Sequence, residues 1–191
     1  MSRRAGTVAV ACATVLCACA AALESTPGAA PSDVACAPVA GPLGEGSTLE
    51  GRAGVYRLEM LDEDGGRRTA GTLTLVAQPD SMRSVAEATS TLFGSTTARP
   101  ADVGAPTVGG LESIDPSAPG VLVLERERDQ GRSVVLSLGS ALNRRDMTYF
   151  DAASVVLEVL RIDADGFAGD WRGEVGARTS RGYFCAARPA S

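Results

Sequence analysis

The sequence of residues 166–175, GFAGDWRGEV, constrains the fold more than any other stretch of the chain. Side chains alternate across an extended strand, so Phe167, Trp171 and Val175 fall on one side. The other side carries Ala168, Asp170, Arg172 and Glu174. This alternation predicts a half-buried strand with its aromatic face inward. A turn and a second extended stretch, residues 181–188, follow, which indicates a β-hairpin closing a small sheet or barrel.

Similar alternation recurs along the chain, separated by turns rich in Asp and Gly. Residues 54–61, 71–76, 121–128, 132–138 and 154–162 read as strands. The middle part, 78–120, is less regular, and 82–93 fits either a strand or a short helix. Sequential strands joined by tight turns predict an all-β fold, an antiparallel up-and-down barrel of about eight strands, because closure removes exposed edges.

The N-terminus predicts export. Arg3 and Arg4 precede an uncharged run, residues 5–16, and small residues follow it, as in a secretory signal peptide. The run is too short to span a membrane, which takes about 20 apolar residues. We therefore expect a signal peptide at 1–18, a flexible linker or tether at 19–50 that is rich in Ala, Pro and Gly, and a barrel domain at 51–188.

Two routes of cleavage are open. Residues 16–19 are similar to a lipobox, which predicts lipidation of Cys19. Residues 18–20 also fit a plain signal-peptidase site. We favour the lipoprotein, and expect either an outer-membrane lipoprotein or a periplasmic or secreted protein.

The cysteines divide in a way that predicts one disulfide. Cys12, Cys17 and Cys19 belong to the signal region, which leaves Cys36 and Cys185 in the folded part. An even pair in an exported protein is typical of a disulfide.

Composition excludes several classes of function. The chain has no His, and all 18 of its basic residues are Arg. Imidazole catalysis, His-ligated metals and Lys-based chemistry are therefore excluded. A net charge of -5 argues against nucleic acid and against a polybasic membrane patch, so we expect membrane contact only through a lipid anchor. No pattern points to a cofactor or to a catalytic residue.

Four polar stretches are candidate sites. The acidic turns at 62–65 and 163–166 invite a calcium reading, but hairpin geometry already explains Asp-Gly, so no metal site is predicted. Residues 125–128 alternate Glu and Arg, which predicts ion pairs on a solvated face. Residues 143–146, Asn-Arg-Arg-Asp, fit a solvated turn better than an anion site.

The domain resembles a group of exported bacterial proteins with a lipocalin-like barrel. The matching stretches are 54–58, 71–75, 115–121, 143–146, 166–171 and 182–186. Lipocalins carry Gly-x-Trp in their first strand, where this chain has Gly54-Val55-Tyr56. The resemblance implies a barrel and no particular activity.

The leading functional hypothesis is therefore a non-catalytic protein of the cell envelope. It would bind a small hydrophobic ligand inside the barrel, at Phe167 and Trp171. One alternative is a filled barrel that acts as a structural module or binds an envelope protein. The other is a carboxylate-based enzyme.

Overall fold

The computed structural model describes residues 35–78, 84–85, 88–106, 110–111, 113–128, 131–141 and 154–189. The chain divides into two units, residues 1–30 and 31–191, and every described residue belongs to the second unit. The predicted signal peptide, Cys19 and the 143–146 cluster lie outside the described residues. Within those residues, no helix is long and apolar enough to cross a bilayer.

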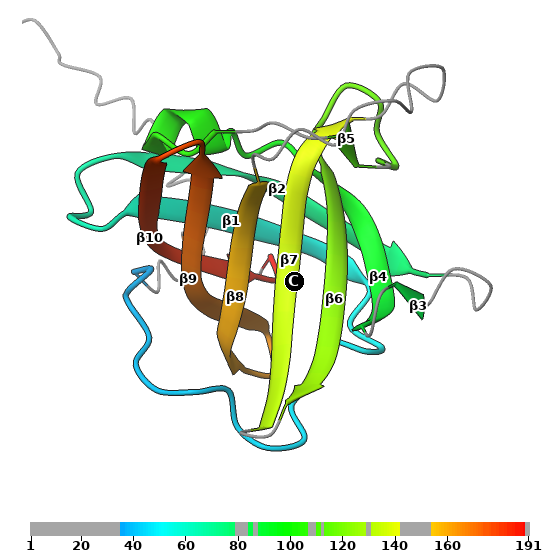
Figure 1. Ribbon diagram of the computed structural model, residues 1–191. Helices are drawn as coiled ribbons and strands as arrows, with labels where there is room; N and C mark the ends of the chain where they lie inside the picture. Colours follow the sequence, from blue (N-terminus) through cyan, green and yellow to red (C-terminus); the bar gives the residue numbers. More distant parts are fainter. Residues whose placement is uncertain are drawn as a thin grey trace, which may run out of the picture. The chain divides into compact units, whose positions relative to one another are not determined.

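The described residues of the second unit contain ten strands (Figure 1). Their bounds are β1 Gly54–Asp62, β2 Arg68–Ala77, β3 Ser84–Val85, β4 Ala88–Thr96, β5 Gly110–Leu111, β6 Gly120–Arg128, β7 Gly131–Ala141, β8 Ser154–Ile162, β9 Gly166–Val175 and β10 Arg178–Ala187. The two-residue β3 and β5 are additions at the side. The other eight strands are antiparallel neighbours in chain order, and β10 returns to pair with β1. The predicted all-β, up-and-down barrel is confirmed.

The strands form where apolar residues alternate with polar ones. In β1, Tyr56, Leu58 and Met60 are buried, whereas Arg57 is exposed. The turn between β1 and β2 follows Asp62 and contains Gly65 at φ 69°, a left-handed conformation that favours glycine. The predicted bounds of β8 and β9 match the structure. In the irregular middle part, the strand reading of residues 88–93 is confirmed by β4.

The barrel interior is packed with apolar side chains. Leu58, Met60, Leu73, Leu136 and Leu157 are each 0% exposed and belong to one contiguous core. A lumen wide enough for a ligand would leave accessible surface on the side chains lining it. The described interior therefore behaves as a filled core, close-packed as protein interiors are.

The indole of Trp171 is part of this core and is tied to β1. Its Nε1 donates a hydrogen bond to the carbonyl oxygen of Leu61 at 2.7 Å. Gly182 is the cross-strand partner of Trp171. A Cβ at Gly182 would collide with the Leu61 oxygen and would lie 2.6 Å from the indole nitrogen. The missing side chain therefore makes room for this bond.

The two ends of the barrel are closed by different segments. At one end lies the 3₁₀ helix η2, Pro100–Val103, whose Val103 is fully buried. At the other end, near the end of β6, Leu49 is fully buried in the same core and donates a hydrogen bond to Glu125. Figure 1 shows η2 and the end of β6 that carries its arrowhead at opposite ends of the barrel strands. Leu49 falls in the stretch predicted as linker, so the domain takes in residues ahead of β1.

Candidate functional site

The two aromatic residues predicted to bind a ligand lie inside the barrel. Phe167 and Trp171 are 2% and 1% exposed. The Phe167 ring packs edge-on between Tyr56 and Phe184, with centroid distances of 5.3 and 6.2 Å. Their inward orientation is confirmed, and their contact with a ligand stays a prediction. The side chain of Val175 is not among those described.

The outward face of β9 divides into a covered and an exposed part. Asp170, Arg172 and Glu174 are exposed, as the alternation predicts. Ala168 also points outward, yet it is only 2% exposed. Its cross-strand partner is Cys185, which carries the segment from Cys36 on this side of the wall.

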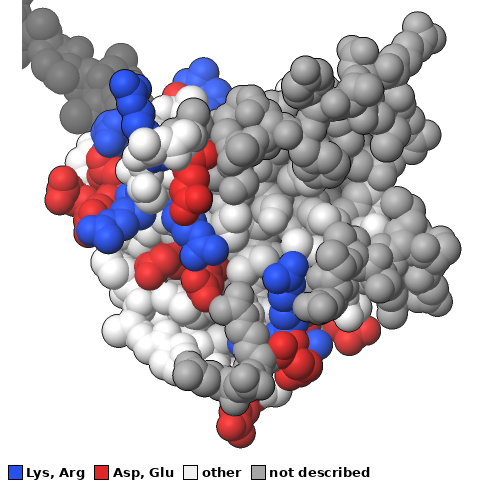
Figure 2. Space-filling view, viewed as in Figure 1, with Lys and Arg blue, Asp and Glu red and all other residues white. Residues whose placement is uncertain are grey.

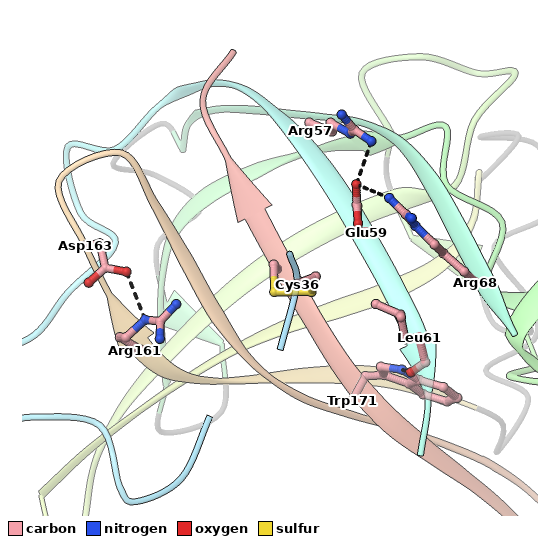
Figure 3. The surroundings of a disulfide bond; sticks show 9 residues. Cys36, Arg57, Glu59, Leu61, Arg68, Arg161, Asp163 and Trp171 are labelled. Carbon is pink, nitrogen blue, oxygen red and sulfur yellow. Dashed lines mark hydrogen bonds and ion pairs between the residues drawn. A yellow bond between two sulfur atoms is a disulfide. The ribbon is translucent and has the colours of Figure 1, made fainter. Parts of the chain in front are cut away.

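The predicted disulfide between Cys36 and Cys185 is confirmed, with the two Cα atoms 5.6 Å apart. Figure 3 shows the short segment around Cys36 lying across the strand that carries Cys185. The bond therefore holds the N-terminal part of the described chain against the outer wall of the barrel.

Among the described residues, one acidic side chain lies in the barrel interior. Glu125 is 2% exposed and occupies the end that Leu49 closes. Its Oε1 accepts hydrogen bonds from the Leu49 backbone N–H at 3.0 Å and the Thr91 hydroxyl at 3.2 Å. Its Oε2 accepts one from the Thr48 hydroxyl at 2.8 Å and forms an ion pair with Arg132 Nη2 at 2.9 Å. Both oxygens are thus fully engaged in holding the fold, as a buried charge requires.

The prediction that residues 125–128 lie on a solvated face is wrong for Glu125. Val121, Val123 and Glu125 share one face of β6, and the two valines are fully buried. The same alternation therefore turns Glu125 inward. The Arg132 side chain, 26% exposed, covers it from the β7 side and also lies 3.6 Å from Glu127. The alternation of β6 already predicts that Glu125 points inward with Val121 and Val123. The run of four charged residues, 125–128, suggested a solvated face instead.

Basic side chains pair with an acid in each of the two acidic turns. The Arg67 backbone N–H and side chain both bond to Asp62, and they hold the pKa of this carboxyl below its ordinary value. Asp163 pairs with Arg161 at 2.9 Å. Within the described part of the chain, no group of three or more His, Cys, Asp or Glu side chains is arranged to hold a metal ion.

A hollow of about 400 Å³ lies on the outer wall formed by β8, β9 and β10. Two carboxylates line it, because Glu158 of β8 is the cross-strand partner of Asp170 of β9. Its less polar lining comes from Val156, Tyr183 and Pro38. Pro38 stands two positions after the disulfide-bonded Cys36, so the disulfide places one wall of this hollow. We call it the outer groove.

Asp170 differs in its partners from Glu59, an outward-facing acid of β1. Glu59 pairs with Arg57 and Arg68, each at 2.7 Å, as Figure 3 shows. By contrast, no hydrogen bond or ion pair joins Asp170 within the described residues. Partial burial raises the pKa of the Asp170 carboxyl above its ordinary value of 3.8, and the charge of Glu158 raises it further.

Charge on this side of the molecule is mixed. Among the residues that the structure describes, Figure 2 shows acidic and basic side chains interspersed on this face. A second hollow, of about 590 Å³, lies beside the β1–β2 turn, and the Glu63–Arg181 ion pair at 2.8 Å lines it. Sequence reasoning missed the outer groove because its parts lie on three strands and on a segment held by a disulfide.

Comparison with known proteins identifies no relative of this chain. No family model matches the chain, and no curated protein or solved structure is significantly similar to it. The barrel, its closed ends and its outer groove are therefore the basis on which function is inferred.

Proposed function

We propose that the protein is a non-catalytic, exported component of the cell envelope that binds a partner protein through the outer surface of a filled barrel. The main observation in favour of a filled barrel is that inward side chains such as Leu58, Leu73 and Leu136 have no accessible surface. A carrier of hydrophobic ligands needs a concave apolar site, which binding pockets of 300–1,000 Å³ typically provide. The described interior leaves no such space, which favours the filled-barrel alternative over the ligand carrier.

The hydrogen bonds and ion pair of Glu125 argue against a carboxylate-based enzyme. An acid that works as proton donor or acceptor must reach substrate, and glycoside chemistry needs two such acids facing one bond. Glu125 is the one buried acid among the described residues, and its oxygens already bind Thr48, Leu49, Thr91 and Arg132.

Export, a cell-envelope location and lipidation of Cys19 are part of this proposal. The Cys36–Cys185 bond is compatible with export, since disulfides persist in oxidising compartments outside the cytosol. The proposal also extends the resemblance to exported bacterial lipoproteins with lipocalin-like barrels. If Cys19 is acylated, Cys19→Ala should move the protein from the membrane fraction to the soluble fraction. An unchanged, acylated membrane form would contradict the role of Cys19.

Trp171 fluorescence tests whether the interior binds ligands. We expect a blue-shifted emission that does not respond saturably to a fatty acid or a hydrophobic dye. Leu157 is the cross-strand partner of Trp171, so Leu157→Ala supplies a matched control. Its cavity should admit a small apolar probe such as benzene and change the emission, because apolar cavities bind such probes. A saturable response of the unaltered protein to fatty acid would overturn the filled-barrel proposal.

A further inference from the structure

We propose that the outer groove is the docking site for the partner, and that it accepts an extended peptide segment presenting an arginine or lysine side chain beside an apolar residue. This inference rests on the proposed function and adds to it the surface and the chemistry of the partner.

The register of the sheet places like charges opposite one another in the groove. Glu158 is the partner of Asp170, and Arg172 is the partner of Arg181. Like charges directly opposite in a sheet are destabilising. Arg181 is compensated by Glu63 at 2.8 Å, and Arg172 reaches Glu158 only at 3.9 Å. Asp170 is left as the carboxylate that a cation from outside would neutralise.

The groove also offers less polar surface next to these charges. Val156 and Tyr183 are half-buried outward side chains of β8 and β10, and Pro38 supplies a further part of the wall. Because the disulfide at Cys36 fixes Pro38, this wall exists before a partner arrives. A preformed wall reduces the ordering that binding requires.

The two carboxylates of the groove, on Glu158 and Asp170, favour a positively charged ligand group. A guanidinium or ammonium group would lie against Glu158 and Asp170, while its apolar neighbour contacts Val156, Tyr183 and Pro38. The chain's own residues 24–34 precede the groove wall, but they contain Glu24 and Asp33 and no basic residue. Their charge has the same sign as that of Asp170, so they are a poor match. A basic segment of another protein is complementary to Asp170, because the groove's own Arg172 and Arg181 already face Glu158 and Glu63.

The test titrates isotope-labelled protein, with its disulfide intact, with acetyl-Ala-Leu-Arg-Leu-Ala-amide and follows backbone amide shifts by NMR. The same peptide with Glu in place of Arg is the second probe. We expect saturable shifts at Val156, Asp170 and Tyr183 with the Arg peptide only. Asp170→Asn should weaken binding about fivefold, the upper range for an exposed ion pair. Glu174→Gln is the matched control, since Glu174 is an exposed acid on the same strand outside the groove lining, and it should bind normally.

Equal binding of both peptides, or an unchanged affinity of Asp170→Asn, would overturn the groove inference. Saturable shifts confined to another face would also overturn it, while leaving the proposed function in place. Failure of the proposed function has a different signature. Fatty acid would then shift the amides of interior residues such as Leu58 and Trp171, whatever the peptides do.

Discussion

Glu125 and Asp170 are both acidic residues in long strands of one barrel, yet their surroundings are opposite. Glu125 points inward and binds two hydroxyl groups, a backbone N–H and an arginine. Asp170 points outward and faces the like charge of Glu158 across the strands. An acid with every oxygen engaged stabilises the fold, whereas one without a counter-charge is available to a partner. A carboxylate thus stabilises the fold at position 125, and at position 170 it is left without a counter-charge among the described residues.

The largest expected effect follows from Glu125→Ala. Removing one member of a buried charge pair leaves the other uncompensated, and this costs about 3–5 kcal/mol. Here the Leu49 N–H and the hydroxyl groups of Thr48 and Thr91 also lose their acceptor. Urea denaturation gives the free energy of unfolding. A cost below about 1 kcal/mol would contradict the structural role of Glu125, since surface substitutions lie in that range.

Leu49→Ala tests the barrel end that Leu49 and Glu125 close, without changing the charge there. Leu49 is 0% exposed, and truncating a buried leucine costs about 2–5 kcal/mol in transfer and cavity terms. The control is Val55→Ala on β1, where the side chain is 49% exposed. We expect that variant to lose less than about 1 kcal/mol. If both variants lose the same free energy of unfolding in thermal or urea denaturation, Leu49 contributes no more to the fold than an exposed side chain, as expected of a linker.

Loss of the disulfide should have an intermediate effect. Cys36→Ser combined with Cys185→Ser removes a crosslink with a sequence separation of 149. Native disulfides typically contribute about 2–4 kcal/mol, chiefly by restricting the unfolded chain. Because Leu49 and Glu125 hold the closed end independently, we expect the barrel to stay folded. Amide exchange should then rise at residues 36–40 and not at Leu49, and a rise at both would show that one anchor depends on the other.

The smallest effect is expected from Asp170→Asn, a change of within about 0.5 kcal/mol at an exposed position. Its sign depends on pH. The folded-state pKa of Asp170 lies above 3.8, so the folded protein holds this proton more tightly than the unfolded chain. The wild-type protein therefore loses stability as pH rises from 3.8 through the raised pKa.

The variant lacks this loss. Asp170→Asn should match wild type near pH 3 and be slightly more stable at neutral pH. The lowered pKa of Asp62 acts in the opposite direction below pH 3.8, but it is common to both proteins and cancels in the difference. A variant that loses stability at neutral pH would show that Asp170 has a favourable partner, and would remove the contrast with Glu125.

Local sequence was sufficient for most of the strands and for the disulfide. The period-two alternation around Phe167 and Trp171 depends only on neighbouring residues, and so do the turns that follow Asp62 and Asp163. Cys36 and Cys185 were paired by counting, because no other cysteine remained in the folded part. These features can be predicted without knowing which strands pair with one another.

Only the tertiary structure decided the filled interior, the role of Leu49 and the outer groove. Leu49 stands in a stretch without periodicity, and its burial depends on an acceptor 76 positions away, Glu125. The groove exists because the register sets Glu158 opposite Asp170 and Tyr183 beside it, while the disulfide adds Pro38. A slip of one residue would turn these side chains to the other face, and no local pattern specifies such a register.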